Sequence, residues 1–200
     1  IGRLALGAQN FTSATANYNI AIGYAAGGAV TTGVQNTVIG GLAGDAITTG
    51  DNNVALGYDA LSANTTGTSN VAVGAGALDA NTTADFNIAV GQGALGANTT
   101  GNSNTAIGYL AMTTETKGDR NVALGMQALQ TQNFTTNTDS YNTALGYYAL
   151  RLNTTGTKNT SVGAESLDAN TTGIENTAIG YNALTANTTA SANTGVGAFV

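Results

Sequence analysis

Eleven carboxylates are the side chains of this 200-residue chain that could act as acids, bases or metal ligands, since it contains no histidine and no cysteine. Without those two residue types the usual nucleophile triads and thiol sites cannot be built. A carboxylate pair could still cleave a glycosidic bond, but no acidic pair recurs in a fixed arrangement. We therefore expect a solvated acidic surface and no enzyme. The acids are Asp45, Asp51, Asp59, Asp79, Asp85, Glu115, Asp119, Asp139, Glu165, Asp168 and Glu175.

Cofactor and nucleic-acid sites leave patterns that this sequence lacks. Neither the Gly-Gly-x-Gly-x-Asp repeat of calcium-binding β-rolls nor the Gly-Lys-(Ser/Thr) of a phosphate-binding loop occurs. We expect no metal and no cofactor. A net charge of −6 gives no electrostatic footprint for nucleic acid, and no apolar run approaches the roughly 18 residues of a membrane span. We therefore expect neither nucleic acid nor membrane as a partner of this segment.

Nine asparagines begin an Asn-x-(Ser/Thr) pattern, which is the acceptor for N-linked glycans. Most lie in Asn-Thr-Thr segments that are typical of exposed turns. Two interpretations stay open: a glycan-coated surface, or Asn and Thr retained for turn geometry and stacked hydrogen bonds. Rows of Thr also suit ice binding, although a turn is a poor place for a flat surface. The nine are Asn10, Asn64, Asn81, Asn98, Asn133, Asn153, Asn159, Asn170 and Asn187.

Five tyrosines follow the glycine of a recurring motif and are candidate ligand contacts. Exposed aromatic rows can stack on sugars, which would make a cell-surface glycan or receptor the partner. Alternatively, each ring covers the glycine bend of its own or a neighbouring coil. The gaps in the row after Gly40, Gly74 and Gly163 favour this second interpretation. The five are Tyr24, Tyr58, Tyr109, Tyr147 and Tyr181.

All these residues recur because the chain is built from one repeat. The glycine that closes Asn-x-Ala-(Ile/Leu/Val)-Gly returns with a 17-residue period from Gly23 to Gly197, except for one longer step between Gly125 and Gly146. The exception predicts a four-residue insertion within residues 130–141. A short period that covers the whole chain predicts a solenoid. Residues 1–200 therefore form a single repetitive segment of about 12 repeats.

The two ends of the segment lack the features of capping repeats. A degenerate first copy ends at Gly7, one position closer to Gly23 than the period requires, with Arg3 in place of the Asn. The last copy stops at Val200, before its turn. Terminal repeats of a solenoid normally cover the core and the strand edges. We therefore expect this segment to be an excerpt of a longer chain.

Each repeat predicts one coil of a parallel β-solenoid. Residues 71–73, 88–90 and 105–107 are short, rich in β-branched residues and followed by Gly, which is typical of a strand. The next segment, Tyr-x-Ala-Leu-x-Ala, suits a second short strand or a helical turn, and Asn-Thr-Thr-Gly suits a turn. Coils that stack through backbone pairing would rise roughly 4.8 Å each. The fold class is therefore all-β, a β-solenoid or β-roll of 17-residue coils.

The strands are apolar on both faces, which raises the question of partners. Adjacent residues of a strand point to opposite sides, so Ala can fill a narrow interior while Ile, Leu or Val lies outside. Repeated along the rod, these residues would form an apolar stripe that soluble monomers avoid. We expect the stripe to be buried between copies, in a homotrimer or filament. The alternative is a wider monomeric coil with the large residues inside.

The motif resembles the head repeats of trimeric autotransporter adhesins, most clearly at residues 87–91, 104–108 and 176–180. It is also similar to the tandem repeats of bacterial and phage tail-fibre-like proteins. The resemblance implies a trimeric β-roll, found on a cell surface or virion, that acts as the shaft or head of an extracellular adhesin or tail fibre. A glycan-bearing surface filament and a carbohydrate- or ice-binding repeat are the alternatives.

Overall fold

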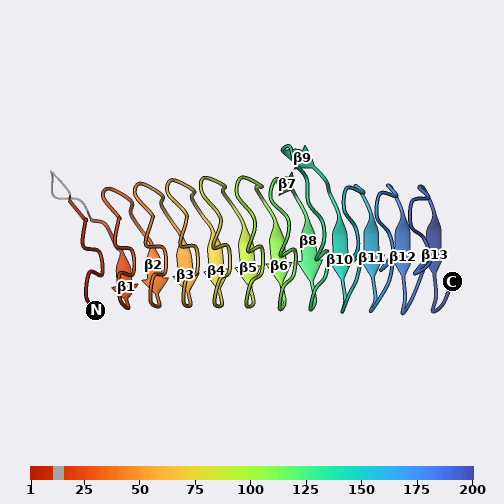
Figure 1. Cartoon of the computed structure of the whole chain (residues 1–200), viewed down its shortest axis with the longest axis horizontal. Helices are drawn as coiled ribbons and strands as arrows, with labels where there is room; N and C mark the ends of the chain where they lie inside the picture. Colours follow the sequence, from red (N-terminus) through yellow and green to blue (C-terminus); the bar gives the residue numbers. More distant parts are fainter. Residues whose placement is uncertain (11–15) are drawn as a thin grey trace.

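The chain forms a straight rod of stacked coils, as seen in a computed structural model that describes residues 1–10 and 16–200. The two termini lie at opposite ends of the rod, and each coil passes once through a short strand and two turns (Figure 1). Every secondary-structure element in the described residues is a β-strand. The expected all-β solenoid with a parallel sheet is confirmed.

Eleven strands within the described residues form one parallel sheet, in which each strand pairs with that of the next coil. The register is the same from coil to coil, with Ala55 opposite Ala72 and Ala72 opposite Ala89. The strands are β1 (Ile20–Ile22), β2 (Thr37–Ile39), β3 (Val54–Leu56), β4 (Val71–Val73), β5 (Ile88–Val90), β6 (Thr105–Ile107), β8 (Val122–Leu124), β10 (Thr143–Leu145), β11 (Thr160–Val162), β12 (Thr177–Ile179) and β13 (Thr194–Val196).

A column of glycines follows the strands, and its backbone geometry excludes any side chain. Gly57 has a φ of +142°, and a Cβ there would collide with the carbonyl oxygen of Gly74 in the next coil. Gly2 has the same geometry, with a φ of +138°, and would collide in the same way with Gly23. The prediction that the first copy ends at Gly7 is therefore wrong. Residues 3–7 resemble a strand in sequence but occupy the turn after the glycine, and it is Gly2 that precedes Gly23 in the column.

The segment after each column glycine is neither the second strand nor the helical turn that were expected. Its second and fourth residues have positive φ, as at Asp59 (+54°) and Leu61 (+55°). Hydrogen bonds between residues three apart, such as Ala60 N–H to Gly57 O, mark successive tight turns. The backbone also bonds between coils here, with Leu61 N–H donating to Ala77 O at 2.9 Å. Hydrogen bonds therefore link the coils on this side of the rod as well as in the sheet.

The interior is thin and is filled by small residues plus one large residue per coil. In the third coil the middle strand residue Ala55 packs with Ala60 and Leu61, all fully buried. Where the large position is Gly44, the volume is supplied by Val38 and Ile47 instead, whose side-chain carbons occupy the space of an added Cβ. Close packing of this kind is required because each layer is only one coil thick.

A ladder of asparagines, buried except at its two ends, runs through the interior one residue before each strand of the main sheet. The backbone N–H of Asn53 donates to Oδ1 of Asn36 at 3.0 Å, and its Nδ2 donates to the carbonyl of Gly67 across the coil at 2.9 Å. The amide-to-Oδ1 bond recurs at 2.8–3.0 Å in every step. We call this the strand Asn ladder. Its members are Asn19, Asn36, Asn53, Asn70, Asn87, Asn104, Asn121, Asn142, Asn159, Asn176 and Asn193.

The expected insertion leaves the stack intact. Asn133 N–H still bonds to Thr154 O, and Ser140 N–H to Asp119 O, so the extra residues lie between these two positions, within the expected segment. They project from the rod and add β9 (Thr138–Asp139), which pairs with β7 (Gly118–Asp119) of the preceding coil (Figure 1). The main sheet continues directly from β8 to β10.

We expect Asn87→Ala to destabilise the rod by about 2–4 kcal/mol, because it leaves the buried N–H of Asn104 without an acceptor and opens a cavity. Urea unfolding followed by circular dichroism measures the change. Thr66→Ala is the control, since this exposed residue should contribute less than about 0.5 kcal/mol. Equal losses in the two variants would contradict the role given to the ladder.

Candidate interaction surfaces

The outward face of the main sheet carries the apolar stripe expected from the sequence. In each strand the middle residue is turned inward and its two neighbours outward, as with Ala106 between Thr105 and Ile107. The residue before the column glycine is always Ile, Leu or Val, and we call this row the apolar column. Its exposure reaches 43% at Leu124 and 66% at Val196. The column consists of Ile22, Ile39, Leu56, Val73, Val90, Ile107, Leu124, Leu145, Val162, Ile179 and Val196.

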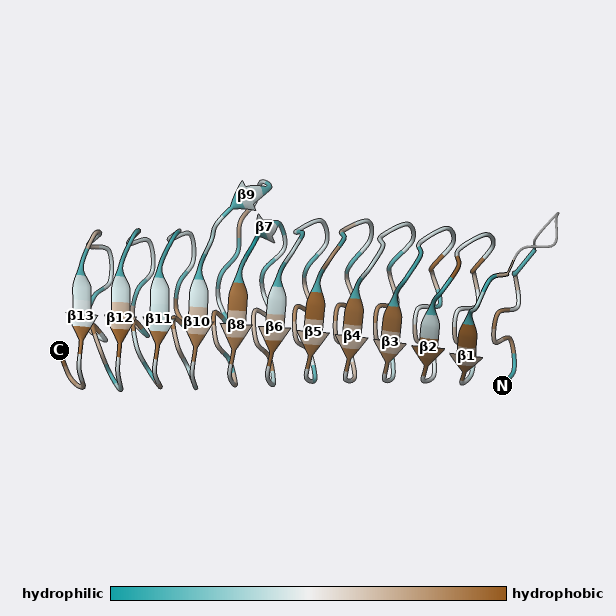
Figure 2. Cartoon of the chain, turned by 180° about the vertical axis from the view of Figure 1, so that it is seen from behind, coloured by the Kyte–Doolittle hydropathy of each residue, from teal (hydrophilic) through white to brown (hydrophobic). Residues whose placement is uncertain are grey.

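The stripe becomes more polar towards the C-terminal end of the rod. The first strand residue is Ile or Val in β1, β3, β4, β5 and β8, and Thr in β2, β6 and β10 to β13. Figure 2 accordingly shows brown strands in the N-terminal part and paler ones towards the C-terminus. No outward strand position in the described sheet holds a charged residue. The face is therefore uncharged along its whole length, and one of its two rows is apolar throughout.

The tyrosines lie beyond the glycine bend, at the edge next to this face. All five remain half exposed, from 43% for Tyr147 to 60% for Tyr58. The ring of Tyr58 also lies against the preceding coil, since its Cδ2 is 3.7 Å from the position of a Cβ on Gly41. The ring of Tyr58 therefore covers part of a neighbouring coil, and all five rings still present a surface to solvent. Covering of a neighbouring coil was expected, and the exposed ring surfaces leave the ligand-contact interpretation open.

An aromatic and ionic cluster surrounds one of these tyrosines. The rings of Tyr147 and Tyr148 stack with centroids 3.9 Å apart, and the Arg151 guanidinium lies 4.3 Å from the centre of Tyr148. Asp168, in the next coil, accepts two hydrogen bonds from Arg151, at 2.9 and 3.1 Å. The neighbouring Tyr148 side chain raises the pKa of Tyr147. Sequence reasoning did not identify this cluster, because its acid, Asp168, is brought to Arg151 only by the stacking of coils.

The glycosylation patterns mostly lie in the interior, which corrects the expectation that they form an exposed edge. Six of the nine asparagines are fully buried: Asn64, Asn81, Asn98, Asn153, Asn159 and Asn170. Asn159 belongs to the strand Asn ladder, and the others to a second row that we call the turn Asn ladder. In that row Asn81 Nδ2 donates to Asn64 Oδ1 at 2.9 Å and to Ala84 O at 3.2 Å.

The remaining three patterns differ in position. Asn187 is half buried and its Nδ2 is bonded to Asn170 Oδ1. Asn133 is exposed in the loop of the insertion, where its Oδ1 accepts a bond from Thr116. Asn10 is exposed, but Phe11 and Thr12 of its pattern lie outside the described residues. The six buried amide groups favour the structural interpretation of the Asn-Thr-Thr turns, since each is held by hydrogen bonds inside the coil.

The turn Asn ladder is interrupted by a buried carboxylate. Glu115 takes the Asn position and is fully buried, and its oxygens accept bonds from Gln132 Nε2 at 2.7 Å and Gly118 N–H at 2.7 Å. A carboxylate cannot donate to the coil before it. Asn98 Oδ1 is accordingly a buried acceptor without a partner in the described structure. Sequence reasoning placed Glu115 with the solvated acids, and this was wrong.

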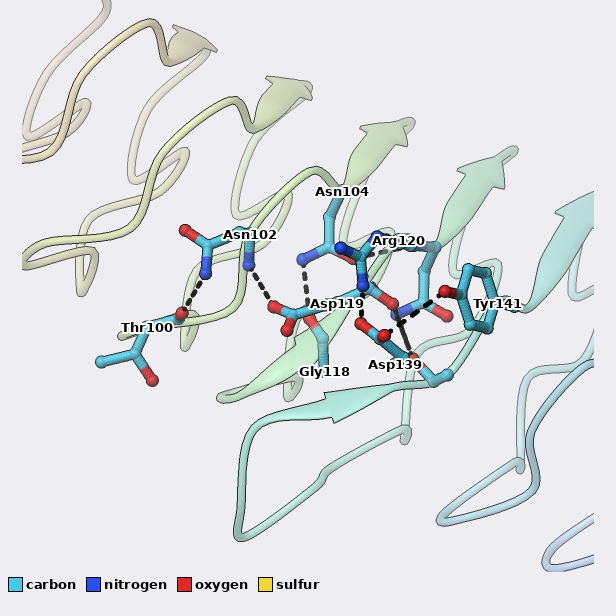
Figure 3. A network of polar contacts seen from close by, with 10 residues as sticks. Thr100, Asn102, Asn104, Gly118, Asp119, Arg120, Asp139 and Tyr141 are labelled. Carbon is cyan, nitrogen blue, oxygen red and sulfur yellow. Dashed lines mark hydrogen bonds and ion pairs between the residues drawn. The ribbon is translucent and has the colours of Figure 1, made fainter.

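The coil with the insertion carries a polar network on its surface (Figure 3). Arg120 forms an ion pair with Asp139 of β9 and lies 5.7 Å from the ring centre of Tyr141. The Tyr141 hydroxyl donates to Asp139 Oδ2 at 3.3 Å. On the inner side, Asp119 Oδ1 accepts the backbone N–H of Asn102. These contacts hold the projecting loop against the rod, and each charged group has its partner within the network.

Asp119 is one of three acids in a recurring arrangement that the sequence reading missed. Asp85 and Asp51 occupy the same coil position two and four coils earlier. Each accepts the backbone N–H of the residue 17 positions before it, Thr68 at 2.6 Å and Val34 at 2.7 Å, respectively. The signal was the regular spacing of the three acids, which lie two repeats apart. These acids satisfy backbone donors at the surface of the turn.

No group of three or more acids among the described residues is arranged to hold a metal ion. Burial raises the pKa of both Asp45 and Asp79, and the charge of Asp59 raises the pKa of each further. The described residues contain no helix of the length and apolar character needed to cross a membrane. Comparisons with protein-family models, with curated proteins and with solved structures gave no match.

We expect Glu115→Asn to stabilise the rod by about 1–2 kcal/mol, because it removes a buried charge and supplies a donor to Asn98 Oδ1. Thermal unfolding measures the gain. Asp139→Asn, which alters an exposed ion pair, is the control and should change stability by less than about 1 kcal/mol. A loss of stability in Glu115→Asn would show that the ladder tolerates a carboxylate without cost.

The raised pKa values of Asp45 and Asp79 predict a pH dependence. The folded chain retains protons that the unfolded chain has already released, so these carboxyls lower stability as pH rises above their ordinary value of 3.8. The variant Asp45→Asn with Asp79→Asn should therefore melt at a higher temperature than the parent at pH 7. The difference should vanish at pH 3, and a difference that persists there would contradict this account.

Proposed function

We propose that this segment is a structural rod of an extracellular fibre, the shaft or head of an adhesin or of a tail fibre, that holds a binding part away from a surface. The single observation that carries the proposal is the uninterrupted parallel sheet, in which the strand of every coil pairs with the strand of the coil before it. The eleven strands extend over about 50 Å at roughly 4.8 Å per strand. In this proposal the role is mechanical and not enzymatic.

Stiffness along the axis is what such a spacer requires. Each coil is joined to the next by backbone bonds in the sheet, by bonds on the turn side and by the strand Asn ladder. Threonines add a fourth row, in which Thr65 Oγ1 donates to Thr82 O at 3.0 Å. Bending the rod would lengthen bonds in several of these rows at once. The arrangement therefore favours a rigid spacer.

The apolar face supports self-association as part of this function. An uncharged strip about 50 Å long and three residues, or about 10 Å, wide covers about 500 Å². Its apolar column is continuous, whereas the first strand residue is Thr in six of the eleven strands. The strip bears no charge along the described sheet. We propose that three copies bury this face around an axis parallel to the rods. The resemblance to trimeric adhesin heads supports three copies rather than two.

The structure bears differently on the alternative functions. A glycan-bearing filament is less favoured, because six of the nine acceptor side chains are buried and hydrogen-bonded. Ice binding through the threonines is also less favoured, because hydroxyls such as that of Thr65 already bond to the next coil. Binding of carbohydrate is supported by the half-exposed tyrosines, and it is compatible with a fibre.

Sedimentation equilibrium tests the proposed assembly. We expect a mass three times the 19.7 kDa of the chain. The variant Ile107→Glu with Leu145→Glu places two charges on the apolar column and should sediment as a monomer, because charge burial at the interface is unfavourable. The matched variant Thr66→Glu with Thr83→Glu adds the same charge to exposed turn residues and should remain trimeric. A monomeric parent chain, or identical behaviour of the two variants, would contradict the proposal.

A further inference from the structure

Three tyrosines in the C-terminal half lie at intervals of two coils on one edge of the rod. Tyr109, Tyr147 and Tyr181 each follow the column glycine, in alternate coils. Their carbonyl oxygens accept the N–H of Gln127 at 2.9 Å, Glu165 at 2.8 Å and Phe199 at 3.1 Å, respectively. Because each backbone is fixed to the next coil, the three backbone positions that carry the rings are about 10 Å apart, twice the separation of neighbouring strands.

The rings are available for contact. Tyr109, Tyr147 and Tyr181 are 46%, 43% and 49% exposed, and the coils between them carry the smaller or flexible side chains Met126 and Ala164 at the same position. None of these five residues is charged. The edge therefore presents three aromatic surfaces, separated by less bulky positions, to a ligand that lies along the rod.

The spacing identifies the kind of ligand. In an extended peptide, side chains on one face recur at about 7 Å, which does not match the rings. A nucleic acid would be repelled by a chain of net charge −6. In an extended β-1,4-linked polysaccharide every second sugar presents the same apolar C–H face, and one disaccharide unit covers about the distance between two rings. Aromatic rings pack well on such faces.

We propose that this edge binds an extended, neutral β-1,4-linked polysaccharide, with alternate sugars stacked on Tyr109, Tyr147 and Tyr181. Polar groups for the sugar hydroxyls lie one residue further along, at Gln127 and Glu165 in the intervening coils. Tyr148 stacks on one face of Tyr147, whose side chain remains 43% exposed. This site lies beyond the glycine bend from the apolar column, so it does not depend on the proposed trimer.

The test is depletion binding of the chain to microcrystalline cellulose. We expect saturable binding, and no binding to amylose, which has the same sugar but coils through α-linkages. Each of Tyr109→Ala, Tyr147→Ala and Tyr181→Ala should weaken affinity about two- to tenfold. Tyr18→Ala and Phe86→Ala are the controls, since these residues are more exposed, at 71% and 61%, but lie outside the row.

A spacing variant distinguishes binding at this site from nonspecific binding through exposed aromatic side chains. Tyr147→Ala combined with Ala164→Tyr keeps the number of rings but moves the central one by a coil. It should bind as weakly as Tyr147→Ala alone. Circular dichroism and sedimentation establish that each variant keeps the fold and assembly of the parent, so loss of binding is distinguished from failure of the fibre proposal. The proposal is overturned if the parent does not bind cellulose, if it binds amylose equally well, or if the spacing variant binds like the parent.

Discussion

The structure depends on one constraint, which is that residues at equivalent positions of successive coils must form hydrogen bonds with each other. The strand Asn ladder expresses it most directly. Most of its side chains accept the backbone N–H of the next Asn and donate across the interior to the opposite turn, as Asn87 does with Asn104 and Gly101. One residue thus fixes the height of its coil and the distance between its two sides. A slip by one residue would bury unpaired amides in every layer, which is costly.

Variation is tolerated where it respects this constraint. Within one coil, a small residue at one core position is compensated by larger side chains at other positions, as where Val38 and Ile47 fill the space at Gly44. The two buried hydroxyls of Ser161 and Ser166 bond to each other where most coils have two alanines. The insertion projects from a turn, so β8 and β10 remain paired in register. Glu115 is the exception, since it leaves a neighbouring acceptor unsatisfied.

Much of the fold could be predicted because the repeat period and the alternation of inward and outward side chains can be recognised in the sequence. The regular return of the motif glycine predicted the coils, and β-branched residues before Gly predicted strands with Ala inside and Ile outside. The turn after the glycine could not be predicted, because it places residues such as Leu61 at positive φ, which side chains rarely adopt. Only bonds to neighbouring coils and burial of the Leu compensate for that strain. The burial of the Asn-Thr-Thr asparagines and of Glu115 was also missed, since it follows from stacking and not from polarity.

The surfaces follow from the same repetition, because whatever one coil exposes is repeated along the rod. The central claim, that the Asn ladder holds the coils in register, is tested most directly by native-state hydrogen exchange at single amides. The account predicts that the backbone amides of Asn53, Asn87 and Asn159 exchange only on global unfolding, with similar protection free energies. Exchange of these amides as fast as that of exposed turn residues would contradict it.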